Sequence, residues 1–150
     1  MVKNVFKKLG KKQKNNKGFS LVELIVVIAI MAVLVGVLAP QLIKYVEKSR
    51  EATDIQTCDN IATALKTYYA DEEVSATTVT VTLSKTELGT GADAAVKDAG
   101  LTKAKIKGTK WTSDTIKIEY NKADGTITYT GDSPYYHSEN DQFKKGAKTK

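Results

Sequence analysis

Few residues in this sequence are placed where they could do chemistry, and the most conspicuous of them is Glu23. It is the single charge in residues 19–39, which read FSLVELIVVIAIMAVLVGVLA. An ionisable group in a membrane segment costs up to ~3 kcal/mol at the midplane and less near the interface, so it calls for a compensating partner. A local role is also open, because Ser20 and Glu23 have the spacing of a helix capping box.

The other reactive side chains do not form a recognisable catalytic set. Cys58 is the only cysteine, which makes an internal disulfide impossible. The only histidine, His137, lies in a polar stretch where no ligand or catalytic role is expected. Without a Ser/His/Asp set, a Cys–His cluster or a phosphate loop, the sequence predicts a non-enzyme with no cofactor. The acidic residues near the C-terminus do not have the spacing of a standard calcium loop: Asp132, Glu139, Asn140 and Asp141.

Charge is distributed unevenly along the chain. The sequence has 23 basic and 17 acidic side chains, but residues 1–18 hold seven lysines and no acid. From residue 19 onward 16 basic residues face 17 acidic ones, so the basic excess belongs to one short end and not to a nucleic-acid-binding face. Just beyond the apolar run, three bases (Lys44, Lys48, Arg50) are balanced by three acids (Glu47, Glu51, Asp54).

The apolar run and the residues after it predict one long helix. As a helix, residues 19–39 span ~31 Å, the thickness of a bilayer core, and the preceding lysines favour a cytoplasmic N-terminus. Residues 40–70 continue as an amphipathic helix, with Pro40 at the join as a kink that does not end it. One face of this second half is apolar, at spacings of three and four: Ile55, Cys58, Ala62, Leu65 and Tyr69. On this face Cys58 is expected to be a small core thiol.

Residues 71–131 predict a loop and a small sheet. Alternation indicates strands at 79–83, 116–120 and 127–129, the last two forming a hairpin around the turn 121–125. A short helix is expected at 93–99, and residues 103–111 could add another strand, with Trp111 as a core anchor. The lysines of that stretch would form one solvated face: Lys103, Lys105, Lys107 and Lys110. Residues 132–150 are expected to be a polar tail.

These elements predict an α+β fold. A long N-terminal helix carries a small antiparallel sheet on its second half, and the Ile and Tyr face of the sheet covers Ile55, Leu65 and Tyr69.

The N-terminal residues resemble those of the type IV pilin superfamily, in particular a Gram-positive major type IV pilin. The basic leader 1–18 ends in Gly18, Phe19 follows, and Glu23 lies four residues later inside the apolar stretch. Pro40 matches the family's helix-kinking proline, and the close match covers roughly residues 10–45. The resemblance implies that a prepilin peptidase cleaves after Gly18 and methylates the new amine of Phe19. It also implies that an assembly ATPase and a platform protein draw the subunits from the membrane into a homopolymeric filament.

The same residues indicate how such a filament could form. A stripe of small side chains lies 160–240° around the helix from Glu23: Ala29, Ala32, Gly36 and Ala39. Small residues allow helices to approach closely, and two different contact faces favour head-to-tail polymers. The stretch from Gly36 to Pro40 is the weakest part of the helix, because the proline lacks the N–H that would bond the carbonyl of Gly36.

Three functions remain open from the sequence. The leading one is a pilus subunit, held in the cytoplasmic membrane with its N-terminus inside and then moved to a surface filament for adhesion or motility. The second is a pseudopilin of a secretion or DNA-uptake system, whose N-terminal motif is the same. The third is a single-pass anchored binding domain that never polymerises.

Overall fold

The computed structural model describes residues 18–70, 77–89 and 92–147. Its main element is helix α1, Leu21–Tyr68, which continues through Pro40 without a break in helical structure. The chain divides into two compact units, Met1–Pro40 and Gln41–Lys150. We call the described part of the first, residues 18–40, the apolar segment, and the second the globular unit. Residues 1–17 of the expected leader lie outside the described residues.

From Leu21 onward the apolar segment is a single run of helix. The run consists mainly of Leu, Ile, Val and Ala. Its backbone is α-helical although Val and Ile are weaker helix formers than Leu and Ala. Among the described residues, α1 is the helix that is long and apolar enough to cross a membrane, and none of its most apolar 18 residues is buried within the chain.

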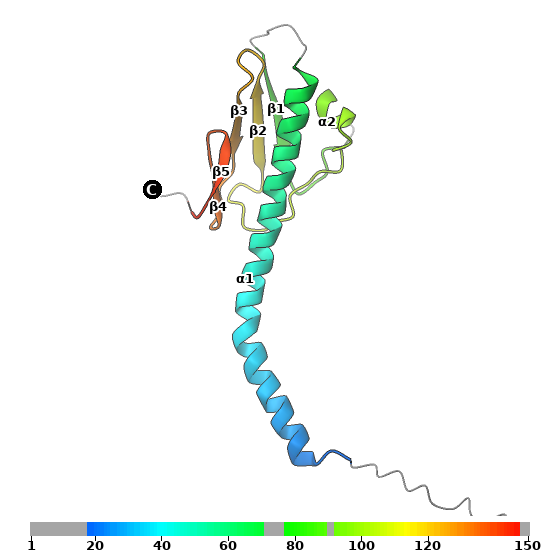
Figure 1. Ribbon diagram of the computed structural model, residues 1–150, viewed down its shortest axis with the longest axis vertical. Coiled ribbons are helices and arrows are strands. Elements are labelled where there is room, and N and C mark those ends of the chain that lie inside the picture. The colour runs from blue at the N-terminus through cyan, green and yellow to red at the C-terminus, as the bar shows by residue number, and fades with distance from the viewer. Residues whose placement is uncertain (1–17, 71–76, 90–91, 148–150) are drawn as a thin grey trace, which may run out of the picture. The chain divides into compact units, whose positions relative to one another are not determined.

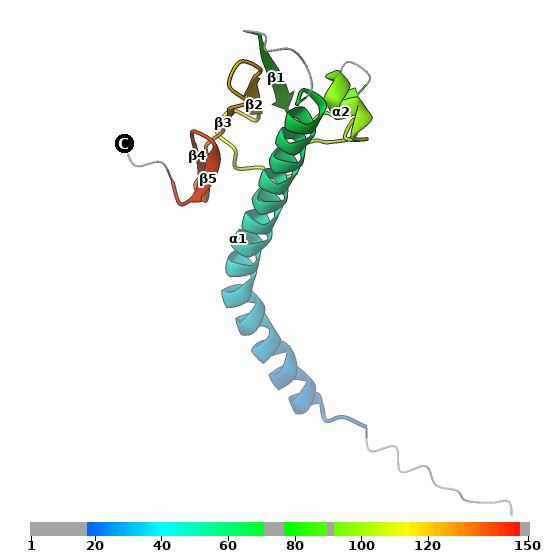
Figure 2. The ribbon, with the colours of Figure 1, turned by 45° about the horizontal axis from the view of Figure 1, so that its top comes forward.

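The globular unit contains a three-stranded antiparallel sheet in the order β1–β2–β3, with β1 at Thr78–Leu83, β2 at Ile116–Asn121 and β3 at Ile127–Thr130. Ile118 is the central pairing partner of both Val81 and Tyr129. Buried and exposed residues alternate along β2 and β3, as expected for a sheet with one face on a core. Figures 1 and 2 show the second half of α1 lying along this sheet.

The core lies between α1 and the sheet. Leu65 is fully buried in this core. Ile55 and Tyr69 pack against the core with part of their surface exposed, as the sequence predicted. Tyr69 stacks on Tyr120 with ring centroids 6.0 Å apart, and the hydroxyl of Tyr129 donates a hydrogen bond to Asp59 at 3.0 Å. These contacts confirm the predicted α+β fold, with the sheet on the second half of the helix.

Two expectations about the second half of the chain were wrong in part. Residues 103–111 are a loop and not a strand: Ile106 makes one backbone bond to the carbonyl of Ser84, but the N–H groups of 107–109 bond side chains of α1 instead of a neighbouring strand. The residues 132–150 are more than a polar tail, since they contain a hairpin of β4, Tyr136–Glu139, and β5, Gln142–Lys145. Its strands are short and polar and gave no clear alternation in the sequence.

The short helix α2, Ala94–Asp98, agrees with the sequence prediction. Asp93 caps it, because its carboxylate accepts a hydrogen bond from the N–H of Ala95 at 2.9 Å. The same carboxylate accepts a bond from the hydroxyl of Tyr69 at 2.9 Å, which ties α2 to the C-terminal end of α1.

Candidate processing and assembly site

The start of α1 is a capping box built from Ser20 and Glu23. The N–H of Ser20 donates to Glu23 Oε2 at 2.7 Å, and the N–H of Val22 donates to Ser20 Oγ at 3.3 Å. Two N–H groups at the free helix end thereby gain partners, and the Glu23 carboxylate also lies at the positive end of the helix dipole. The local role of Glu23 is therefore present in the folded chain.

Gly18 and Phe19 have no structural role that the described residues reveal. A Cβ added at Gly18 would meet no atom within 4 Å, and Phe19 is 91% exposed. A glycine is normally required by a positive φ or by close approach of other atoms, and no close approach occurs here. The described residues therefore give no reason for a glycine at this position.

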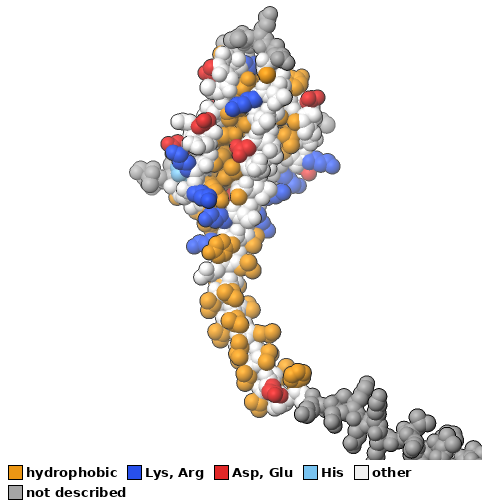
Figure 3. All heavy atoms as spheres, viewed as in Figure 1, with side chains coloured by type: hydrophobic (Ala, Val, Ile, Leu, Met, Phe, Trp, Pro, Cys, Tyr) orange, Lys and Arg blue, Asp and Glu red, His pale blue; other side chains and the backbone are white. Residues whose placement is uncertain are grey.

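The small-residue stripe of the apolar segment is equally unused within the chain. Ala29, Ala32 and Gly36 are exposed, Ala39 is partly exposed, and a Cβ on Gly36 would meet nothing within 4 Å. The large apolar side chains from Leu21 to Leu38 are each at least 48% exposed, and Figure 3 shows hydrophobic side chains along the whole segment in this view. Soluble monomers rarely leave so much contiguous apolar surface in water, so lipid or other protein must cover it.

A second group of functional side chains lies in the globular unit, on α1. Glu47, Glu51 and Asp54 are 6%, 0% and 0% exposed. Asp54 accepts hydrogen bonds from the N–H of Lys107 and of Gly108, both at 2.8 Å, and its Oδ2 also accepts one from Trp111 Nε1 at 2.9 Å. Charge-assisted bonds of this kind are about twice as strong as neutral ones.

The other two acids hold neighbouring segments. Glu47 accepts a short hydrogen bond from the N–H of Thr109, and Glu51 accepts one from the hydroxyl of Ser133. Among the described residues, Glu51 Oε1 has no hydrogen-bond partner. Burial is the main cause that raises the pKa of Glu51; the bond from Ser133 opposes this shift, and the charges of Glu47 and Asp54 add to it.

Gly108 allows this arrangement by its lack of a side chain. A Cβ there would lie 2.8 Å from Glu51 Cγ and 2.9 Å from both Asp54 Oδ2 and Trp111 Nε1. The three acids thus clamp the loop 107–109 and the turn at Ser133 onto the helix, which is a structural role. Trp111 is 3% exposed, in agreement with its predicted place in the core.

The clamp was not predicted from the sequence, where the three acids read as surface charges that balance three bases. A signal was present: 47, 51, 54, 58, 61 and 65 recur at spacings of four and three, so the acids continue the buried face that includes Cys58 and Leu65. Cys58 itself is fully buried, and burial raises the pKa of its thiol.

The remaining candidates make ordinary contacts. His137 Nδ1 lies 2.9 Å from the carbonyl oxygen of Gly146, and Glu139 forms an ion pair with Lys144 at 2.6 Å in the β4–β5 hairpin. Across the described residues, no group of three or more His, Cys, Asp or Glu side chains is arranged to hold a metal ion.

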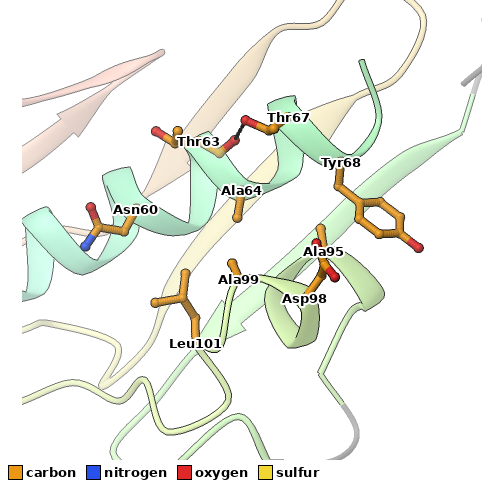
Figure 4. A pocket seen from close by; sticks show the side chains of 9 residues that line it. All are labelled: Asn60, Thr63, Ala64, Thr67, Tyr68, Ala95, Asp98, Ala99 and Leu101. Atoms are coloured by element: carbon orange, nitrogen blue, oxygen red, sulfur yellow. Dashed lines mark hydrogen bonds between the residues drawn. The ribbon is translucent and has the colours of Figure 1, made fainter. Parts of the chain in front are cut away.

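A groove between α1 and α2 carries no reactive set either. Its lining residues are those drawn in Figure 4: Asn60, Thr63, Ala64, Thr67, Tyr68, Ala95, Asp98, Ala99 and Leu101. The hydroxyl of Thr67 is used within the helix, where it donates to the carbonyl of Thr63 at 2.9 Å. The groove therefore combines one carboxylate with amide, hydroxyl and apolar side chains and holds no His, Cys or Lys among its lining residues.

Comparison with known proteins identifies the N-terminal region. Residues 13–39 match the family described as prokaryotic N-terminal methylation motif. The chain is also similar to "Prepilin peptidase-dependent protein A" of Clostridium perfringens, with 36% identity over 78 residues, which are 50% of this chain and 55% of that protein. The chain thus spans about half the length of this curated relative, and no solved structure matches it. Together with the long helix and the small antiparallel sheets, these findings support a type IV pilin-like protein.

Proposed function

We propose that this chain is the structural subunit of a type IV pilus, cleaved after Gly18, N-methylated at Phe19 and assembled through its apolar helix into a surface filament for adhesion or motility. The observation that carries the proposal is the methylation motif over residues 13–39, which includes the Gly18–Phe19 bond and Glu23. The lack of any close contact at Gly18 supports it, because a peptidase can then approach a backbone that nothing in the described chain shields.

Assembly follows from the exposed apolar segment. An apolar helix leaves lipid at least cost when it enters a bundle of identical apolar helices, and the stripe of Ala29, Ala32, Gly36 and Ala39 allows close approach. Cleavage removes the seven lysines of the leader, which would otherwise crowd the axis of the bundle. The weak helical stretch before Pro40 is the place where the helix can loosen during packing.

Glu23 acts as a register check in this proposal. After cleavage the amine of Phe19 is a positive charge in an apolar setting, and the Glu23 carboxylate of a neighbouring subunit can neutralise it. The capping box shows that the carboxylate already lies at the helix end, since it bonds the N–H of Ser20. Only the correct axial register brings the two charges together, so a misplaced subunit keeps an unpaired charge in an apolar bundle.

The partners and locations follow from this life cycle. The precursor lies in the cytoplasmic membrane as a single span with its N-terminus inside, where a prepilin peptidase processes it. An assembly ATPase and a platform protein then move it into the filament, and the chain itself carries out no reaction. What the filament binds is determined by the exposed loops of the globular unit.

Mass spectrometry of sheared surface fibres tests the processing step. We expect an N-terminal peptide that starts at Phe19 and is about 14 Da heavier than the unmodified peptide, the mass of one methyl group. Gly18→Ala should be processed better than a bulky substitution, because close approach of the peptidase is the constraint. A peptide starting at residue 40 or 41, or retention of residues 1–18, would contradict the proposal.

Electron microscopy of the same material, labelled with antibody against residues 41–150, separates the three functions. Long labelled fibres are expected for a pilus subunit. Short labelled stubs would favour a pseudopilin of a secretion or DNA-uptake system, and label confined to membranes would favour an anchored domain that does not polymerise.

A further inference from the structure

The first turns of α1 in the globular unit separate acids and bases by side. The three acids of the clamp are turned inward, between 0% and 6% exposed. The three bases beside them in sequence are exposed: Lys44, Lys48 and Arg50. Charges that cancel in the sequence therefore do not cancel on the surface.

The buried acids are engaged with the clamp and neutralise little of this surface. Arg50 lies 3.7 Å from Glu47, but within the described residues no ion pair is formed by Lys44 or Lys48. The loop held by the clamp adds the exposed side chains of Lys107 and Lys110. Figure 3 shows Lys and Arg side chains gathered where α1 enters the globular unit.

Two of these lysines line a small hollow with two tyrosines. Its residues are Gln41, Lys44, Tyr45, Lys48 and Tyr135, and we call it the Lys44–Lys48 hollow. Tyr135 comes from the turn before β4 and is held there by a hydrogen bond from its N–H to Ser133 Oγ at 3.1 Å. Ammonium groups, phenol hydroxyls and an amide NH₂ all donate hydrogen bonds, and phosphate oxygens accept them.

The position of the hollow along the helix indicates the source of that phosphate. Lys44 follows the end of the apolar run by five residues, a rise of about 8 Å. Lysine extends a long apolar stem toward lipid while its ammonium stays at the headgroups, and tyrosine is enriched at the same depth. When the apolar run spans the hydrocarbon core, the hollow therefore begins at the depth of the lipid headgroups.

We propose that the Lys44–Lys48 hollow binds the phosphate headgroup of an anionic phospholipid while the precursor is in the membrane. The inference rests on membrane insertion of the apolar segment and does not depend on polymerisation. A second copy of the chain is a weaker occupant, because the surface around the hollow is basic and a symmetric contact would bring like charges together.

Lysine acylation of the full-length precursor, one copy per lipid nanodisc, tests the proposal. The modified lysines are identified by mass spectrometry in discs of phosphatidylcholine alone and in discs containing phosphatidylglycerol. We expect Lys44 and Lys48 to react about fivefold more slowly in the anionic discs, because an anionic surface stabilises the charged ammonium. The difference should vanish in 0.5 M salt, which shortens the Debye length to well below ~10 Å.

Internal controls come from two exposed lysines near the other end of the globular part of α1, Lys66 and Lys97. Lys66 lies about 33 Å further along the helix than Lys44, so its reactivity should not depend on the lipid. Equal slowing at all four lysines, or slowing at none, would overturn the proposal. Slowing by inorganic phosphate in zwitterionic discs would assign the hollow to a free anion, and slowing that requires several copies per disc would assign it to a subunit contact.

A pair of variants with equal charge change gives an independent measurement. Phospholipid retained on the detergent-purified precursor is quantified for Lys44→Gln/Lys48→Gln and for Lys66→Gln/Lys97→Gln. The first variant should lose at least half of the retained anionic lipid, whereas the second should keep it. Equal retention in both variants would show that the hollow does not select anionic headgroups.

Discussion

The apolar segment and the globular unit both carry glutamates on α1, but the chain gives them different partners. Glu23 lies in an exposed apolar helix, and within the described residues its carboxylate bonds the backbone N–H of Ser20 at the helix start. Glu51 lies in a polar part of the sequence and is fully buried, with a partner 82 residues away at Ser133. The three acids of the clamp thus bond donors far along the same chain, whereas the described partner of Glu23 lies at the start of its own helix.

The glycines show the same contrast. Gly108 is required by atoms of its own chain, because any Cβ there would meet three side-chain atoms within 2.9 Å. Gly36 meets nothing within 4 Å, so its small size serves no purpose in the isolated chain. The globular unit thus uses its glycine for contacts inside the unit, whereas Gly36 would serve contacts between subunits in the proposed filament.

The largest expected effect is on filament formation by Glu23 variants. Glu23→Ala should be inserted and cleaved normally, yet form few or no filaments, because the subunit no longer neutralises its neighbour's amine. Glu23→Asp should be partly active, and Glu23→Gln should be impaired despite its similar shape. The measurements are pilus counts by electron microscopy and the fraction of processed subunit in the membrane.

The capping box is the alternative explanation for the role of Glu23, and the Glu23→Gln variant distinguishes it from charge pairing. Glutamine also bonds a backbone N–H in a capping box, so that role survives in Glu23→Gln. A normal number of pili from Glu23→Gln as the sole subunit would show that charge pairing is not what this residue supplies.

Gly108→Ala and Gly36→Ala each add one methyl group, the first in the globular unit and the second in the apolar segment. The pair therefore tests the contrast between these two regions. Gly108→Ala is expected to lower the free energy of unfolding by about 2–3 kcal/mol, since overpacking displaces the buried acids from their bonds. Gly36→Ala should not destabilise the chain, because alanine is the better helix former by about 1 kcal/mol. Its expected defect is in filament number, through the small-residue stripe. Chemical denaturation of the detergent-solubilised chain and pilus counts measure the two effects; equal loss of stability in both variants would remove the contrast.

The pH dependence of stability should report on Glu51. Its pKa in the folded chain is raised above the ordinary value of 4.5, so the folded state holds this proton more tightly than the unfolded state. Its contribution to stability is therefore fully present below pH 4.5 and is lost as the pH rises through the raised pKa. Glu51→Gln should remove this component, so the stability of wild type should fall relative to the variant as pH rises. Parallel curves for the two proteins from pH 4 to 8 would contradict the assignment.

The smallest expected effect concerns Cys58. Cys58→Ser should cost about 1–2 kcal/mol, because it buries a hydroxyl in the core. The test protein is residues 41–150, which we expect to fold as a soluble monomer without a disulfide. Its thiol should resist alkylation near neutral pH, as burial raises its pKa. Unfolding of this unit by a reducing agent would instead reveal a bridge between subunits.

Local sequence was sufficient where neighbouring residues determine the structure. The alternation at 116–120 and 127–129 predicted β2 and β3, because burial on one face of a strand repeats every second residue. The apolar run predicted the first half of α1, and the apolar face with Cys58, which repeats every three or four residues, predicted the second half. The strand expected at 103–111 was wrong, because its N–H groups bond carboxylates some 50 to 60 residues earlier.

The sequence by itself predicted the proposed processing and assembly motif, since in this proposal Gly18, Phe19 and Glu23 act through outside molecules and need only their order along the chain. Only the tertiary structure determined that the three acids of the clamp on α1 are buried and hydrogen-bonded. Glu47, Glu51 and Asp54 read as ordinary surface charges until the loop 107–109 and Ser133 bring donors to them. A buried carboxylate is stable only where distant donors converge on it, and that convergence is a property of the folded chain. With these acids buried, Lys44 and Lys48 remain exposed on the surface, which a charge count along the sequence does not show.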